Sequence, residues 1–220
     1  MNTRRTPLTG IAYVVLFLAA IVASNAPKNS ASDHTWVAAY STHGKQAAHL
    51  ASGILLALAG LCLMAFITQL WSAAAARAGS AASPLPVAAA GVAAACVAAG
   101  GVVMATAAAT ALLYSQPLPG ADVLRFSNDA GFALAGVAGM LAASLSVVTL
   151  SAQARRAGLF GVRLQRFSVV VGIVLLGSIA FVPMLALPIW VLTVAIGLLR
   201  GRVGTSAPVR GATPEPSFTG

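Results

Sequence analysis

The chain has 220 residues, of which 59% are hydrophobic and only 8% are charged, and its mean hydropathy is +0.89. A soluble domain carries about 25% charged residues, so this composition excludes a soluble globular enzyme with a polar coat and indicates a membrane protein. The formal net charge is +9. Because the basic residues lie in short segments between apolar runs, this charge favours a topological bias over a nucleic-acid-binding surface.

Six apolar runs predict six transmembrane helices, because about 20 apolar residues are needed to cross a bilayer core about 30 Å thick. The expected spans are residues 8–24, 47–71, 86–114, 130–152, 167–182 and 187–199. The sequence therefore predicts an all-α fold, a polytopic membrane helical bundle over residues 1–200. A disordered cytoplasmic tail, rich in proline and small residues, is expected over 201–220.

The first span begins after Arg4 and Arg5 and ends near the small residues 23–26. A cleaved signal peptide has the same pattern. Because Pro27 follows the candidate cleavage site, and signal peptidases handle proline there poorly, we expect the segment to be retained as a transmembrane helix.

Small residues dominate the third and fourth spans. Residues 86–114 offer little surface to lipid tails, so we expect this span in the middle of the bundle. In the fourth span, small residues recur every four positions on one face: Gly131, Ala135, Gly139 and Ala143. The two glycines favour close packing within the chain, and a homodimer face is the alternative.

The last apolar block, residues 167–199, contains no charged side chain and is too long for one span and short for two. Pro183 and Pro188 interrupt it, and a proline removes a helical hydrogen bond and clashes with the preceding turn. The block therefore predicts a tight hairpin of two short helices. One long, kinked helix is the alternative.

Basic residues predict the orientation, because short cytoplasmic loops carry an excess of Lys and Arg. Ten arginines fall on the side of the N-terminus: Arg4, Arg5, Arg77, Arg155, Arg156, Arg163, Arg166, Arg200, Arg202 and Arg210. Three basic residues fall on the other side: Lys28, Lys45 and Arg125. We expect a multi-pass protein of the bacterial plasma membrane with both termini in the cytoplasm.

Aromatic side chains are expected at the two membrane interfaces, where Trp and Tyr concentrate. Tyr13 and Trp71 come out near the cytoplasmic face, and Tyr114 and Trp190 near the outer face. None is expected at the bilayer centre.

The first outer loop is the richest polar segment, and it contains Asp33, His34, His43 and His49. Carboxylate and imidazole groups are metal ligands, but eight and five residues separate the three histidines, which matches no compact ligand motif. The sequence therefore favours a structural role for these side chains, and we expect no metal site.

The same loop predicts a short amphipathic helix over residues 34–42. Ser32 or Asp33 is a suitable N-cap for it, and Gly44 is a suitable terminator. Its apolar face, which we expect to lie against the membrane, consists of Trp36, Val37 and Tyr40.

Residues 127–129 precede the fourth span as Ser, Asn and Asp, which are typical helix-start residues, and a carboxylate there also suits the helix dipole. The alternative is a small outer cleft in which Asp129 faces His49. The candidate outer polar cluster is therefore Asp33, His34, His43, His49, Asn128 and Asp129.

No ionisable side chain lies inside a predicted span, whereas ion-coupled and proton-coupled transporters normally need one. The sequence contains no nucleophile elbow, phosphate loop, HExxH or CxxC motif. Cys62 and Cys96 lie within apolar runs, without a charged neighbour to activate a thiol. No catalytic residue and no cofactor are therefore expected.

The order of segments carries a resemblance. After a basic start and one span come DHTWVAAYSTHGKQAAHLASGILLALAGL, an Ala-rich pair of spans with the entry NDAGFALAGVAG, and the closing LGSIAFVPMLALPIWVLTVAIGLLRGR. Over about residues 5–202, this order resembles a large group of small six-span integral membrane proteins of unknown function from GC-rich bacteria. The resemblance implies a fold and a membrane location, and it implies no activity.

The sequence favours a non-enzymatic accessory or envelope component that acts through partners. A small transporter or permeation subunit for a neutral or apolar solute, working as an oligomer, is the alternative, and a membrane enzyme ranks third. The expected partners are the lipid bilayer and a second copy or another membrane protein, and not nucleic acid.

Overall fold

The computed structural model describes residues 5–24, 26–28, 30–78, 82–180 and 182–201, so most of the predicted tail lies outside the described residues. Within them the chain is helical and contains no strand. The elements are α1 (Arg5–Ser24), α2 (Asp33–Ala38), α3 (His43–Ala78), α4 (Leu85–Tyr114), α5 (Ala121–Phe132), the π-helical segment η2 (Ala133–Ala138), α6 (Gly139–Arg156), α7 (Val162–Leu176), the 3-10 turns η3 (Ser178–Ala180) and η4 (Val182–Leu185), and α8 (Ala186–Leu199).

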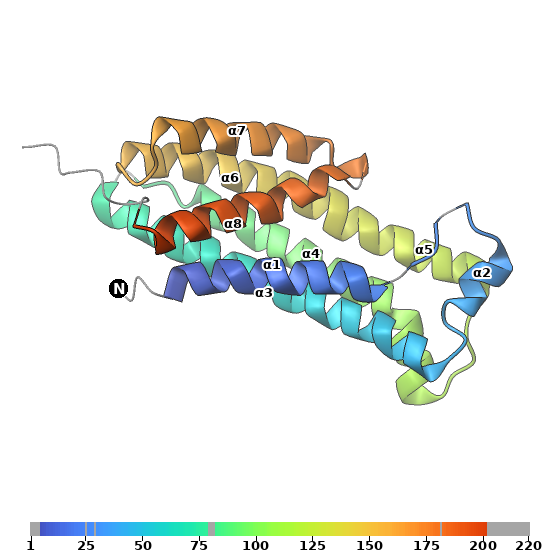
Figure 1. Cartoon of the computed structure of the whole chain (residues 1–220). Helices are drawn as coiled ribbons and strands as arrows, with labels where there is room; N and C mark the ends of the chain where they lie inside the picture. Colours follow the sequence, from blue (N-terminus) through green and yellow to red (C-terminus); the bar gives the residue numbers. More distant parts are fainter. Residues whose placement is uncertain (1–4, 25, 29, 79–81, 181, 202–220) are drawn as a thin grey trace, which may run out of the picture.

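Five helices are long and apolar enough to cross a membrane: Thr6–Ser24, His43–Ala78, Leu85–Tyr114, Ala121–Arg156 and Val182–Leu199. The protein is thus an all-helical membrane protein, and these helices lie roughly along one axis (Figure 1). Helix α7, which covers most of the predicted fifth span, has 15 residues, fewer than the roughly 20 that cross a bilayer core without help.

The helix lengths divide the molecule into a bilayer-length part and a cap. Helix α1 has 20 residues and is therefore about 30 Å long, which matches a bilayer core. Helix α3 and the continuous helix Ala121–Arg156 have 36 residues each, or about 54 Å. They continue past α1 at the end where α2 lies (Figure 1). We call α2 with residues 43–49, 107–114 and 121–125 the cap.

Two helix starts differ from the sequence prediction. Helix α3 begins at His43, so Gly44 lies in its first turn and ends no helix. The fourth span begins at Ala121 after the N-cap Gly120, so residues 127–129 lie inside the helix and do not start it. Both helices continue because the cap supplies packing partners for them beyond the bilayer. A hydropathy average over a segment contains no information about such partners.

The chain reverses direction between α7 and α8 through η3 and η4, and the two helices lie side by side (Figure 1). Pro183 lies in η4, and Pro188 lies in the first turn of α8, where its missing N–H needs no acceptor. Trp190 is fully buried, and its Nε1–H donates a hydrogen bond to Ser168 Oγ at 2.8 Å. This indole therefore joins α8 to α7 inside the bundle.

Glycines set the closest helix approaches. A Cβ on Gly101 of α4 would stand 2.7 Å from the carbonyl oxygen of Gly53 in α3, and a Cβ on Gly100 would stand 2.5 Å from that of Gly131. Gly139 also faces α4, where a Cβ would meet Val97 at 3.3 Å. The small-residue face of the fourth span thus lies against α4 of the same chain.

Basic side chains gather at the end opposite the cap, which we call the basic end. The described ones are Arg77 at the end of α3, Arg155 and Arg156 at the end of α6, Arg163 and Arg166 at the start of α7, and Arg200 at the end of α8. Figure 1 shows these helix ends on the same side as the start of α1.

Candidate functional site

A cavity of about 340 Å³ lies between α1 and α5, next to the cap. This volume is within the range of about 300–1,000 Å³ found for ligand pockets. Its walls are mainly apolar: Phe17, Ile21, Leu56, Met104, Phe132 and Met184. An apolar space of this size suits part of an acyl chain or a similar apolar group.

The cavity exists because the α7–α8 pair is short. Its connecting turn ends well before the cap (Figure 1), and Met184 of η4 lines the cavity where the turn stops. The π-helical segment contributes Ala135 and Gly136, and such segments occur frequently at functional sites. A Cβ on Gly136 would stand 2.8 Å from the Phe132 ring, so the glycine makes room for that ring.

Three polar side chains line the cavity toward the cap. Ser52 Oγ donates a hydrogen bond to the carbonyl oxygen of Ala20 at 2.8 Å, and Ser24 Oγ donates one to Ile21 at 3.0 Å. The half-buried amide of Asn128 has no hydrogen-bond partner among the described residues. Asn128 is therefore the polar group that a bound molecule can engage.

A second, more open space of about 500 Å³ adjoins the cavity and shares Ser24 and Ala26 with it. Its wall carries three basic side chains: Lys28, Lys45 and His49. Lys45 Nζ donates one hydrogen bond to the carbonyl oxygen of Ala38 at 2.6 Å, which leaves two of its three N–H groups available. We call this space the basic mouth.

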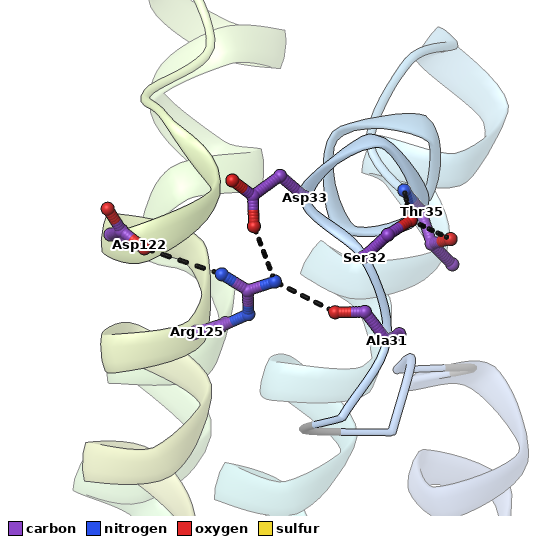
Figure 2. Close-up of polar contacts among 6 residues, drawn as sticks. All are labelled: Ala31, Ser32, Asp33, Thr35, Asp122 and Arg125. Atoms are coloured by element: carbon purple, nitrogen blue, oxygen red, sulfur yellow. Dashed lines mark hydrogen bonds and ion pairs between the residues drawn. The ribbon is translucent and has the colours of Figure 1, made fainter.

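Arg125 of α5 holds α2 in place over the bundle (Figure 2). Its guanidinium forms an ion pair of 2.7 Å with Asp33 and a second of 3.3 Å with Asp122, and it donates a 2.8 Å hydrogen bond to the carbonyl oxygen of Ala31. It also lies 5.9 Å from the centre of the Trp36 ring, within cation–π range. Three of these contacts, to Asp33, Ala31 and Trp36, join α5 to α2 and to the segment before it, whereas Asp122 lies on α5 itself.

Replacing Arg125 by glutamine is expected to release α2 from α5, because the variant loses the charged hydrogen bonds to Asp33 and Ala31. Hydrogen–deuterium exchange measured by mass spectrometry should become about tenfold faster over residues 33–40. The control is Asp122→Asn, whose side chain is 97% exposed and which should leave this exchange unchanged. Equal acceleration in both variants would contradict the role assigned to Arg125.

The short outer helix differs from its prediction in length and in orientation. It spans Asp33–Ala38 with Ser32 as N-cap, whose Oγ accepts a hydrogen bond from the Thr35 N–H at 3.3 Å. Trp36 and Tyr40 are buried against α4 and α5, so they do not face the membrane as expected. Helix α2 packs instead on the extended helices of the cap. Burial raises the pKa of the Tyr40 phenol.

The structure divides the candidate polar cluster among several places. Asp33 is paired with Arg125, and Asn128 lines the cavity. His49 is buried with its ring stacked on Tyr40, the centroids 4.0 Å apart. His34, His43 and Asp129 are exposed. In the part of the chain that the structure describes, no three His, Cys, Asp or Glu side chains are grouped to hold a metal ion.

The sequence prediction did not include the cavity, the basic mouth or the role of Arg125. In the sequence, Lys28 and Lys45, the two lysines of the chain, contribute only to the predicted orientation. Their shared location beyond the first span was a signal that would have suggested a basic site. No such signal marks the cavity, because it depends on where a distant turn ends.

Comparison of the chain with known protein families, with curated proteins and with solved structures finds no match.

Proposed function

We propose that the protein is a six-span, non-enzymatic accessory component of a bacterial plasma membrane that binds an apolar chain from the membrane in the cavity beside α1. In this arrangement α7 and α8 are two short spans, both termini are cytoplasmic, and the cap lies outside. The basic end then faces the cytoplasm, as the positive-inside rule requires.

The cavity carries this proposal. It is bounded on the side of the basic end by a packed core, in which Leu63, Phe66, Met140 and Val191 are all buried. A cavity with such a floor supports binding rather than passage. Helix α1 supplies Phe17 and Ile21 to the cavity wall. This contribution favours a mature protein in which α1 is retained and not cleaved as a signal peptide.

One observation favours a transporter for a neutral or apolar solute as the second candidate. The π-helical segment in the cavity wall contacts the 3-10 turn η3, so two irregular segments meet beside the cavity. A shift of these segments would be needed to open the floor. Flux of a neutral solute into liposomes containing the protein would favour this candidate over the binding function.

The test of the binding function uses a photoreactive dodecanol, a neutral alkyl compound, with the protein in phosphatidylcholine nanodiscs. Peptide mapping should locate adducts on residues 128–136. Ile21→Trp, which fills the cavity, should lower this labelling about tenfold. The control is the neighbouring Val22→Trp at a position 79% exposed, and it should retain the labelling. Equal labelling of the Ile21→Trp and Val22→Trp variants would overturn the proposal.

A further inference from the structure

The cavity and the basic mouth together have the shape of an amphiphile site. They share Ser24 and Ala26, so the apolar space continues directly into the polar one. Ser24 is also the last residue of α1, the helix whose length matches the bilayer core. The junction of the two spaces therefore lies at the level where acyl chains give way to headgroups.

The depth of the cavity fits the end of a chain. On α1 its wall runs from Phe17 to Ser24, a rise of about 10 Å. This depth accommodates a segment of an acyl chain, but not a molecule that spans the whole membrane. A molecule held here leaves its polar end at the basic mouth.

The charge of the basic mouth indicates which kind of headgroup the bound molecule carries. Lys28 and Lys45 are exposed and have no carboxylate partner among the described residues. The acids Asp33 and Asp122 both pair with Arg125 (Figure 2), and neither forms an ion pair with Lys28 or Lys45. Two ammonium groups that have no ion-pair partner among the described residues, at a membrane surface, attract an anionic headgroup.

We propose that the site binds an anionic amphiphile, with an acyl chain in the cavity and a phosphate or carboxylate head at Lys28 and Lys45. The Asn128 amide, which lines the cavity, bonds a polar atom of the bound molecule. This inference rests on the proposed binding function and adds the class of its ligand.

The experiment compares photoreactive dodecanol with photoreactive dodecyl phosphate in phosphatidylcholine nanodiscs. The phosphate should label residues 128–136 at about tenfold lower concentration than the alcohol. Lys28→Gln combined with Lys45→Gln should remove this advantage, so that both compounds label the variant at similar concentrations. The control, Arg163→Gln with Arg166→Gln, removes the same charge from the basic end and should preserve the advantage.

The outcomes separate this inference from the proposed function. Labelling by neither compound would overturn both, whereas equal labelling by both, or an advantage that survives the lysine substitutions, would overturn only the anionic head. Displacement of the photoreactive dodecyl phosphate by inorganic phosphate alone would also overturn it, since the chain would then be irrelevant. Displacement by phosphatidylglycerol identifies a membrane phospholipid as the source, and displacement only by a fatty acid identifies a single-chain lipid. Either result supports the inference.

Discussion

Replacing Gly101 by alanine is expected to lower the free energy of unfolding by about 1–3 kcal/mol. The added Cβ would stand 2.7 Å from the carbonyl oxygen of Gly53 and 2.9 Å from Cβ of Leu56. Since a backbone atom of α3 cannot rotate away, the two helices must separate. Separation loses packing contacts along the whole α3–α4 interface, which is the main source of helix association in a membrane. Chemical denaturation in detergent micelles, followed by circular dichroism, measures the loss.

Gly91 provides the matched control, because it lies in the same helix and faces the same neighbour. A Cβ there would meet only the end of Met64, at 3.8 Å, which is an ordinary contact. Since alanine is the better helix former by about 1 kcal/mol, Gly91→Ala should be neutral or slightly stabilising. Gly101→Ala is thus expected to destabilise the protein, and Gly91→Ala is not. If both were neutral, α3 and α4 would not approach as closely as the structure indicates.

Replacing Trp190 by alanine is expected to cost about 3–5 kcal/mol, as for other fully buried large side chains. The indole is 0% exposed and stands edge-on to Phe66, with ring centroids 6.3 Å apart. Its loss leaves a cavity between α8 and α3 and removes the hydrogen bond to Ser168. The thermal midpoint in micelles should fall accordingly.

Two further variants separate packing from the hydrogen bond. Ser168→Ala keeps the indole but leaves its buried N–H without its acceptor, which should cost about 1–3 kcal/mol. Ile189→Ala changes the neighbouring position, which is 57% exposed, and should change the midpoint little. A loss in Ile189→Ala as large as that in Trp190→Ala would contradict the assignment of Trp190 to the core.

The short α7–α8 pair links stability to the candidate site. Its turn leaves α5 uncovered beside α1, and Met184 in that turn lines the cavity. A full-length pair of spans would have filled this space with side chains. The cavity wall also contains Ala135 and Gly136 of the π-helical segment, which contacts the turn η3. The irregular part of the fold and the candidate binding site therefore coincide.

The membrane class and the apolar helices were predictable because hydropathy and helix length are properties of each segment alone. The spans over 8–24 and 86–114 correspond closely to α1 and α4. The clustering of described arginines at one end also follows from local sequence, since each lies next to a helix end. The small residues of the third and fourth spans could be recognised as packing positions for the same reason.

The tertiary structure decided the features that depend on contacts between distant segments. Tryptophan and tyrosine concentrate at membrane interfaces. Trp36, Tyr40 and Trp190 are nevertheless buried, because side chains from other helices cover them. Arg125 and Asp33 lie far apart in the chain, and only the approach of α2 to α5 makes them a pair. The continuation of α3 and α5 into the cap has the same origin.

Sequence by itself therefore determined that this is a helical membrane protein, which segments are apolar and where the basic residues cluster, because these are sums over neighbouring residues. Only the tertiary structure decided how far the helices extend, which aromatic side chains enter the core and where a cavity opens beneath two lysines. Those features arise from the relative lengths and faces of helices that meet in space, and no single segment contains that information.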